Sequence, residues 1–144
     1  MATVMTLAGK QYFMECGLNK DVPENLVMRL CKNDVTPDED TVLADFTEAT
    51  FTGYAELVTD AADWAVATVG VSGTNHIVAS HGEIEFVSTA DSQDETIYCA
   101  YIATETSGIV IAANRFSDPQ IANHIVNTGD KKTVTSTLTL TESA

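Results

Sequence analysis

The sequence predicts a mainly β fold, an antiparallel β-sandwich or jelly-roll-like domain of about eight strands with one N-terminal α-helix. Short apolar segments recur at intervals of roughly ten residues with turn-forming residues between them, a spacing typical of sandwich strands. The one long segment with helical spacing stands at the front of the chain. The length of 144 residues is ordinary for a single domain. Within it we distinguish an N-terminal helix, residues 1–19, from a β-sandwich domain, residues 20–144.

The predicted helix carries apolar side chains on more than one face. Residues 3–19 contain no proline, and their apolar positions fall three, four or seven apart in two rows: Val4, Leu7, Met14 and Leu18 in one, and Met5, Ala8, Tyr12 and Cys16 in the other. One row suffices to attach a helix to its own domain. The other row therefore indicates contact with a neighbouring subunit or, equally, further packing on the same core.

Two central strands are predicted at residues 96–104 and 109–116. Both are apolar at odd and even positions, which is typical of strands covered on both faces. The Ser107–Gly108 pair joins them into a hairpin. We expect the N-terminal helix or another subunit to cover the second face of these two strands.

The remaining strands alternate between apolar and polar residues. The alternation is clearest in residues 132–141, where threonine occupies almost every second position, and it recurs in residues 25–32 and 83–88. Further short strands are predicted at residues 54–59, 64–69, 76–80 and 121–127.

A long connection, residues 33–56, links two of these strands. Thr36, Pro37 and the acids that follow predict a tight turn or the start of a short helix. Its apolar side chains must be kept from water, so we expect a connection that packs on the domain; they are Val42, Leu43, Phe46, Phe51 and Tyr54.

The net charge of −14, from 21 acidic against 7 basic residues, restricts the partners. A surface this acidic repels phosphate groups, so we expect no binding to nucleic acid or to anionic membranes. We also expect no signal peptide and no membrane span, because no stretch has the required charge pattern or apolar length.

The three cysteines, Cys16, Cys31 and Cys99, are an odd number and include no close pair. Disulfide frameworks use even numbers, and zinc sites use pairs such as C-x-x-C. We therefore predict three reduced thiols in the core of a protein made in the cytoplasm.

No constellation for catalysis or for a cofactor is recognisable. The histidines at positions 76, 81 and 124 lack a metal-binding spacing, and the G-x-S-x-G and H-E-x-x-H motifs are absent. Two acidic segments are candidates for calcium, but they lack the EF-hand order, so solvated turns are favoured; their acids are Asp34, Asp38, Glu39, Asp40, Asp45, Asp91, Asp94 and Glu95. We predict neither a metal nor an enzyme.

Three pieces of the long connection, residues 33–37, 43–49 and 51–55, resemble a segment of small structural proteins from tailed bacteriophages. The resemblance covers about a sixth of the chain and indicates a capsid decoration, or cement, protein. It implies a trimer on the exterior of the virion that binds the major capsid protein and bridges its subunits, after synthesis in the bacterial cytoplasm. It brings no active-site residues.

The predicted contact surface combines the N-terminal helix with the long connection. Its candidate residues are Val4, Leu7, Tyr12, Phe13, Val42, Leu43, Phe46, Phe51 and Tyr54. The alternative is a β-sandwich of a phage tail or fibre that recognises host carbohydrate through residues 70–75 and 89–95. Those loops contain no aromatic side chain for sugar stacking.

Overall fold

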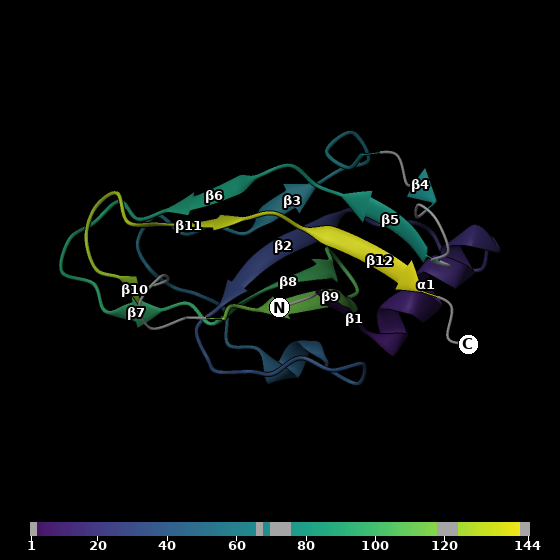
Figure 1. The fold of residues 1–144 in the computed structure, drawn as a ribbon, viewed down its shortest axis with the longest axis horizontal. Helices are drawn as coiled ribbons and strands as arrows, with labels where there is room; N and C mark the ends of the chain where they lie inside the picture. Colours follow the sequence, from purple (N-terminus) through teal and green to yellow (C-terminus); the bar gives the residue numbers. More distant parts are fainter. Residues whose placement is uncertain (1–2, 66–67, 70–75, 118–123, 142–144) are drawn as a thin grey trace.

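The protein is mainly β, as predicted, with antiparallel strands arranged in layers and one α-helix at the end of the layers (Figure 1). The computed structural model describes residues 3–65, 68–69, 76–117 and 124–141.

The lower layer in Figure 1 is a five-stranded sheet. Its strands, in spatial order, are β1 (Val4–Met5), β9 (Val110–Arg115), β8 (Cys99–Thr104), β2 (Leu26–Cys31) and β3 (Leu57–Thr59). The predicted hairpin is present as β8 and β9, and β2 pairs with the other edge of β8 along its whole length. These three strands therefore form the centre of the sheet.

A second layer crosses over this sheet as a bent ribbon of paired strands (Figure 1). Its strands are β4 (Thr68–Val69), β5 (His76–Ser80), β6 (Ile84–Val87), β11 (Lys131–Val134) and β12 (Thr137–Thr141). Pairing changes from β5–β12 to β6–β11 at a bend, where the His81 N–H donates to the Ser136 carbonyl at 2.9 Å. The short pair β7 (Glu95–Thr96) and β10 (His124–Ile125) lies at the end away from the helix.

The main core lies between the two layers. Met28, Leu30 and Ile102 reach it from the five-stranded sheet, while Phe86 and Val134 reach it from the ribbon, and all five are buried. The β6 pattern confirms the predicted half-buried strand, because Ile84 and Phe86 point inward and Glu85 points outward. The architecture is therefore sandwich-like.

The outer face of the sheet is covered by the long connection. Leu43 and Phe46 pack over buried Tyr101, and the Phe46 and Tyr101 rings stack with centroids 4.2 Å apart. This part of the connection contains a short 3₁₀ helix, η1 (Leu43–Asp45). The expectation of a packed connection is confirmed for Leu43, Phe46, Phe51 and Tyr54 but is wrong for Val42, which is 53% exposed. The connection gives this face of the sheet the cover that we had expected from the helix or from another subunit.

The prediction of three reduced thiols is wrong for two of them. Cys31 and Cys99 stand opposite each other on β2 and β8, with Cα atoms 5.2 Å apart, and form a buried disulfide. They are 68 positions apart in sequence, so no local spacing identifies the pair. Closing a loop of this length stabilises the fold by about 4 kcal/mol in the chain-entropy model. Because these two cysteines are oxidised, reduced thiols no longer support our expectation that the protein is made in the cytoplasm.

The helix α1 (Leu7–Gly17) is shorter than the predicted segment 3–19. Val4 and Met5 belong to β1, because they pair with Ala113 and Ala112 on the edge strand β9. Thr6 then caps the helix by accepting a hydrogen bond from the Gly9 N–H at 2.9 Å. Among the described residues, no helix is long and apolar enough to cross a membrane.

Several predicted strands are interrupted, so the strand number exceeds eight. The segment 96–104 breaks between β7 and β8, and the segment 132–141 breaks at Thr135–Ser136. The segment 54–59 is a strand only from Leu57. Of the segment 64–69, Thr68–Val69 forms β4 and Trp64 makes an isolated bridge to His81, while residues 66–67 lie outside the described part. Of the segment 121–127, only β10 is seen as strand, and residues 121–123 lie outside the described part.

Candidate docking surface

Helix α1 has apolar side chains on two opposite sides. Leu7, Met14 and the C-cap residue Leu18 are 52%, 68% and 62% exposed. At 3.6 residues per turn these three project within about 40° of one another. We call them the outer stripe. Gly9 and Tyr12 lie on the opposite side and are buried.

The body-facing side of α1 lies tightly against strand β9. A Cβ placed on Gly9 would come within 2.6 Å of the Ile111 carbonyl oxygen. Tyr12 is only 3% exposed, and its hydroxyl accepts a hydrogen bond from the Glu24 N–H at 2.6 Å. Burial raises the pKa of the Tyr12 hydroxyl above its ordinary value. The outer stripe is therefore held pointing away from the body.

The first turn of α1 is tied to the long connection. The Leu7 N–H donates to the Glu39 carbonyl at 2.8 Å, and the Lys10 ammonium pairs with the Glu39 carboxylate at 2.8 Å. Three residues after Glu39, Val42 is 53% exposed. Just beyond the helix, Val22 is 77% exposed. Five of the seven large apolar residues found exposed in the described part thus belong to this region.

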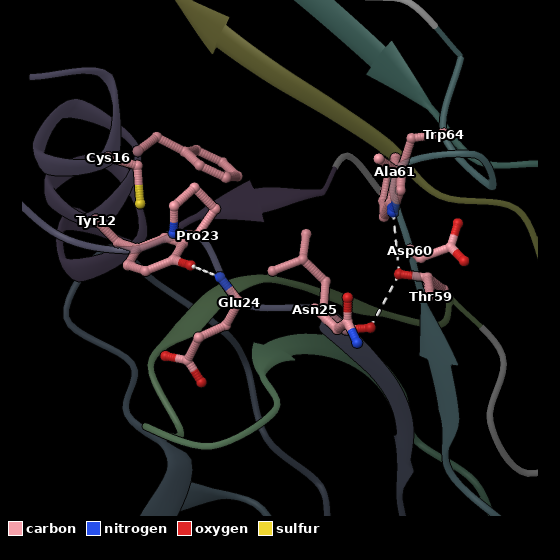
Figure 2. A pocket seen from close by; sticks show the side chains of 11 residues that line it. Tyr12, Cys16, Pro23, Glu24, Asn25, Thr59, Asp60, Ala61 and Trp64 are labelled. Atoms are coloured by element: carbon pink, nitrogen blue, oxygen red, sulfur yellow. Dashed lines mark hydrogen bonds between the residues drawn. The ribbon is translucent and has the colours of Figure 1, made fainter. Parts of the chain in front are cut away.

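A cleft of about 420 Å³ opens on the body side of α1 (Figure 2). The helix forms one wall, the start of β2 forms the floor, and the turn after β3 forms the opposite wall. The lining is mainly apolar and includes three aromatic rings; it consists of Tyr12, Phe13, Cys16, Pro23, Glu24, Asn25, Leu26, Thr59, Asp60, Ala61 and Trp64.

Hydrogen bonds fix the walls of this cleft. The Trp64 indole N–H donates to the Thr59 hydroxyl at 3.0 Å, and that hydroxyl donates to the Leu26 carbonyl at 2.9 Å (Figure 2). The Glu24 carboxylate accepts hydrogen bonds from the hydroxyl and N–H of Ser107 and from the Thr106 N–H. These bonds lower the pKa of Glu24, so it stays ionised near neutral pH.

The structure separates the nine predicted contact residues into different environments. Leu7 and Val42 are exposed, and Tyr12 and Phe51 are buried in the core of their own chain. The others are half-buried: Val4 in β1, Phe13 beside the cleft, Leu43 and Phe46 over the sheet, and Tyr54 against the core. The Tyr54 hydroxyl donates to the Glu48 carboxylate at 3.0 Å.

Our predicted contact residues did not include the three most exposed apolar residues of this region, Met14, Leu18 and Val22. The signal for two of them was present, because Met14 and Leu18 shared a helical row with Leu7. The cleft gave no sequence signal, since its walls come from separate segments.

The acids considered for calcium are dispersed into individual contacts. Asp34 pairs with Arg115 at 2.8 Å, Asp94 contacts His124 at 2.6 Å, and Asp38 caps its own turn through the Asp40 N–H. Within the described residues, no group of three or more potential metal-ligating His, Cys, Asp or Glu side chains occurs.

One of the two loops considered for carbohydrate is fastened to its surroundings. Gln93 accepts a hydrogen bond from the Thr52 N–H at 2.5 Å, and Glu95 accepts two from Thr50, at 2.7 and 2.8 Å. Residues 70–75, the other loop, lie outside the described part. In the loop that can be seen, Gln93 and Glu95 are therefore committed to contacts within the chain.

No family model, curated protein or solved structure matches this chain.

Proposed function

We propose that the protein is a capsid decoration protein of a tailed bacteriophage. In this proposal it binds the outer surface of the assembled capsid as a homotrimer and bridges neighbouring major capsid subunits. The phage assignment and the trimer come from the resemblance of residues 33–55 to that class of virion proteins.

The observation that best supports a docking role is the outer stripe of α1. Isolated exposed apolar residues are common, but Leu7, Met14 and Leu18 align on one side of a helix whose opposite side is already buried. A partner that covers them gains about 25 cal/mol for each Å² removed from water. The stripe therefore fits a contact with another polypeptide.

A rigid attachment makes this stripe suitable for bridging. Gly9 lets α1 approach β9 closely, and Lys10 ties the same helix to the connection through Glu39. A partner bound to the outer stripe is thus attached to the sheet through α1. If each of several copies contacts two capsid subunits, separating those subunits also requires breaking the cement contacts.

The test uses capsids of the encoding phage that lack this protein, to which the purified chain is added. We expect saturable binding at a fixed copy number per capsid, and a raised melting temperature of the capsid through linkage. Met14→Lys combined with Leu18→Lys should weaken binding at least about tenfold. Val87→Lys is the matched control, since Val87 is 38% exposed on β6 in the other layer.

Two results would count against the proposal. One is the absence of the chain from purified heads. The other is equal binding of the stripe variant and the Val87 variant. Mass photometry of the free chain tests the trimer separately.

A further inference from the structure

We propose that the cleft between α1 and the turn after β3 binds a small organic cation, an aromatic or aliphatic group that carries an ammonium. This inference does not depend on capsid binding. It rests on the size, lining and charge of the cleft.

The size and lining suit an apolar group. Small-molecule sites usually occupy about 300–1,000 Å³ and are mostly apolar with a few polar groups. The cleft, at about 420 Å³, lies within this range, and Phe13, Leu26 and Trp64 line it. Burying an apolar group against these side chains supplies the main gain on binding.

The charge of the cleft selects the head group. Two carboxylates, Glu24 and Asp60, belong to the lining, while no lysine or arginine does among the described residues. The Glu24 carboxylate already accepts hydrogen bonds from Ser107 and Thr106, so it adds negative charge near the cleft, and the exposed Asp60 is the carboxylate that a ligand can contact. The net charge of −14 adds a long-range attraction for cations. Phe13 and Trp64, the two aromatic lining residues that are only partly buried, can attract an ammonium further through the negative faces of their rings. A carboxylate ligand of the same size meets repulsion at each of these points.

The cleft is formed before any ligand arrives. Trp64 is held by its bond to Thr59, Thr59 by its bond to Leu26, and Tyr12 by its bond from Glu24. Side chains already fixed in place lose little conformational entropy when a ligand binds. Weak but specific binding of a small ligand is therefore attainable.

Trp64 provides the readout, because it is the only tryptophan in the chain and lines the cleft. The purified chain is titrated with 2-phenylethylamine, 2-phenylethanol and 3-phenylpropanoate, which share a phenyl ring but differ in head-group charge. We expect a saturable change in emission with the amine, at a Kd at least about tenfold below that of the carboxylate. The alcohol should fall between them.

Two matched variants distinguish the effect of a charge in the cleft lining from the effect of the net charge of the protein. Asp60→Asn removes a charge from the lining but keeps the oxygen that accepts the Ala62 N–H at 2.8 Å. It should weaken amine binding several-fold and leave binding of the alcohol unchanged. Asp94→Asn makes the same change of net charge on β7's loop, at the far end from α1, and should have no effect.

A third variant fills the cleft. The side chain of Ala61 lies exposed on the turn, so Ala61→Phe adds a ring without replacing a buried group. It should abolish the emission change, with a thermal melt to check the fold. If that variant does not fold, the comparison of Asp60→Asn with Asp94→Asn decides.

The inference is overturned if no ligand gives a saturable change, or if the amine binds no tighter than the carboxylate. It is equally overturned if Asp60→Asn and Asp94→Asn behave alike, or if a folded Ala61→Phe variant binds as the wild type does. Capsid binding enters none of these outcomes, so each proposal can fail alone.

Discussion

The two sides of helix α1 carry similar apolar side chains but have different surroundings. On the body side, Tyr12 is 3% exposed and Gly9 leaves no room for even a methyl group. On the other side, Met14 is 68% exposed. The contrast teaches that apolar periodicity identifies faces that can be buried, while only the tertiary contacts identify which face the chain buries itself. Substitutions on the two sides should therefore differ in what they damage.

The largest effect on stability is expected from Tyr12→Ala. Removing a buried aromatic side chain leaves a cavity and should lower the free energy of unfolding by about 3–5 kcal/mol. Gln11→Ala, the exposed neighbour on the same helix, is the control and should change it little. Urea denaturation measures both. Equal effects of the two substitutions would remove the distinction between the sides.

The next largest effect on stability is expected at Gly9, and the other glycine of the same helix, Gly17, serves as its comparison. Gly9→Ala should destabilise the fold by about 1–3 kcal/mol, because the new Cβ meets the Ile111 carbonyl and the helix must shift. Gly17→Ala places a methyl group where no atom lies within 4 Å. That variant should gain up to about 1 kcal/mol from better helix propensity. Opposite signs in denaturation experiments are the expected result.

A smaller effect is expected from Tyr12→Phe, which leaves the Glu24 N–H without its acceptor. The loss should be about 1 kcal/mol near pH 7. Burial raises the pKa of Tyr12 in the folded state above its unfolded value of about 10. The associated stability is therefore complete below about pH 10 and is lost as the pH rises through the folded-state pKa.

Denaturation from pH 7 to 11 tests this assignment. The wild type should lose stability above about pH 10 more steeply than Tyr12→Phe. Some slope should remain in the variant, because burial also raises the pKa of Tyr101 to about 12 and raises the pKa of Tyr54. An unchanged alkaline slope would show that Tyr12 is not the group involved.

The smallest effect on stability is expected on the outer stripe. Met14→Lys should change the free energy of unfolding by no more than about 0.5 kcal/mol, because Met14 contacts mainly solvent. The same variant should bind capsids more weakly if the stripe is the docking surface. A large loss of stability would instead mean that the stripe packs within its own chain.

The elements predicted well were those with a strong local period. Strand β2 and the half-buried β6 appear where alternation indicated them, and β8 and β9 appear where apolar residues at both odd and even positions indicated covered strands. The two apolar rows predicted for the helix are confirmed only in part: Leu7, Met14 and Leu18 of one row are exposed and Tyr12 of the other is buried, but Ala8 of that second row is also exposed. The ends of the helix were misjudged because Val4 and Met5, apolar in either structure, pair with the free edge of β9.

Features that join distant segments were not predictable by the same means. The Cys31–Cys99 disulfide depends on the register of β2 against β8. The cleft depends on where the turn after β3 stands relative to α1. The breaks at 97–98 and at 135–136 occur where the chain leaves one partner strand for another, and the strand-like sequence pattern continues across both points.

The sequence by itself determined that this chain is an antiparallel β protein with a front helix apolar on two sides and a strongly acidic surface. These properties follow from the local period and from composition, which every residue carries with it. The tertiary structure alone decided that the long connection covers the sheet, that Cys31 meets Cys99, and that Leu7, Met14 and Leu18 remain exposed. Each of these depends on which segments meet in space, and a period read along one segment contains no information about its neighbour.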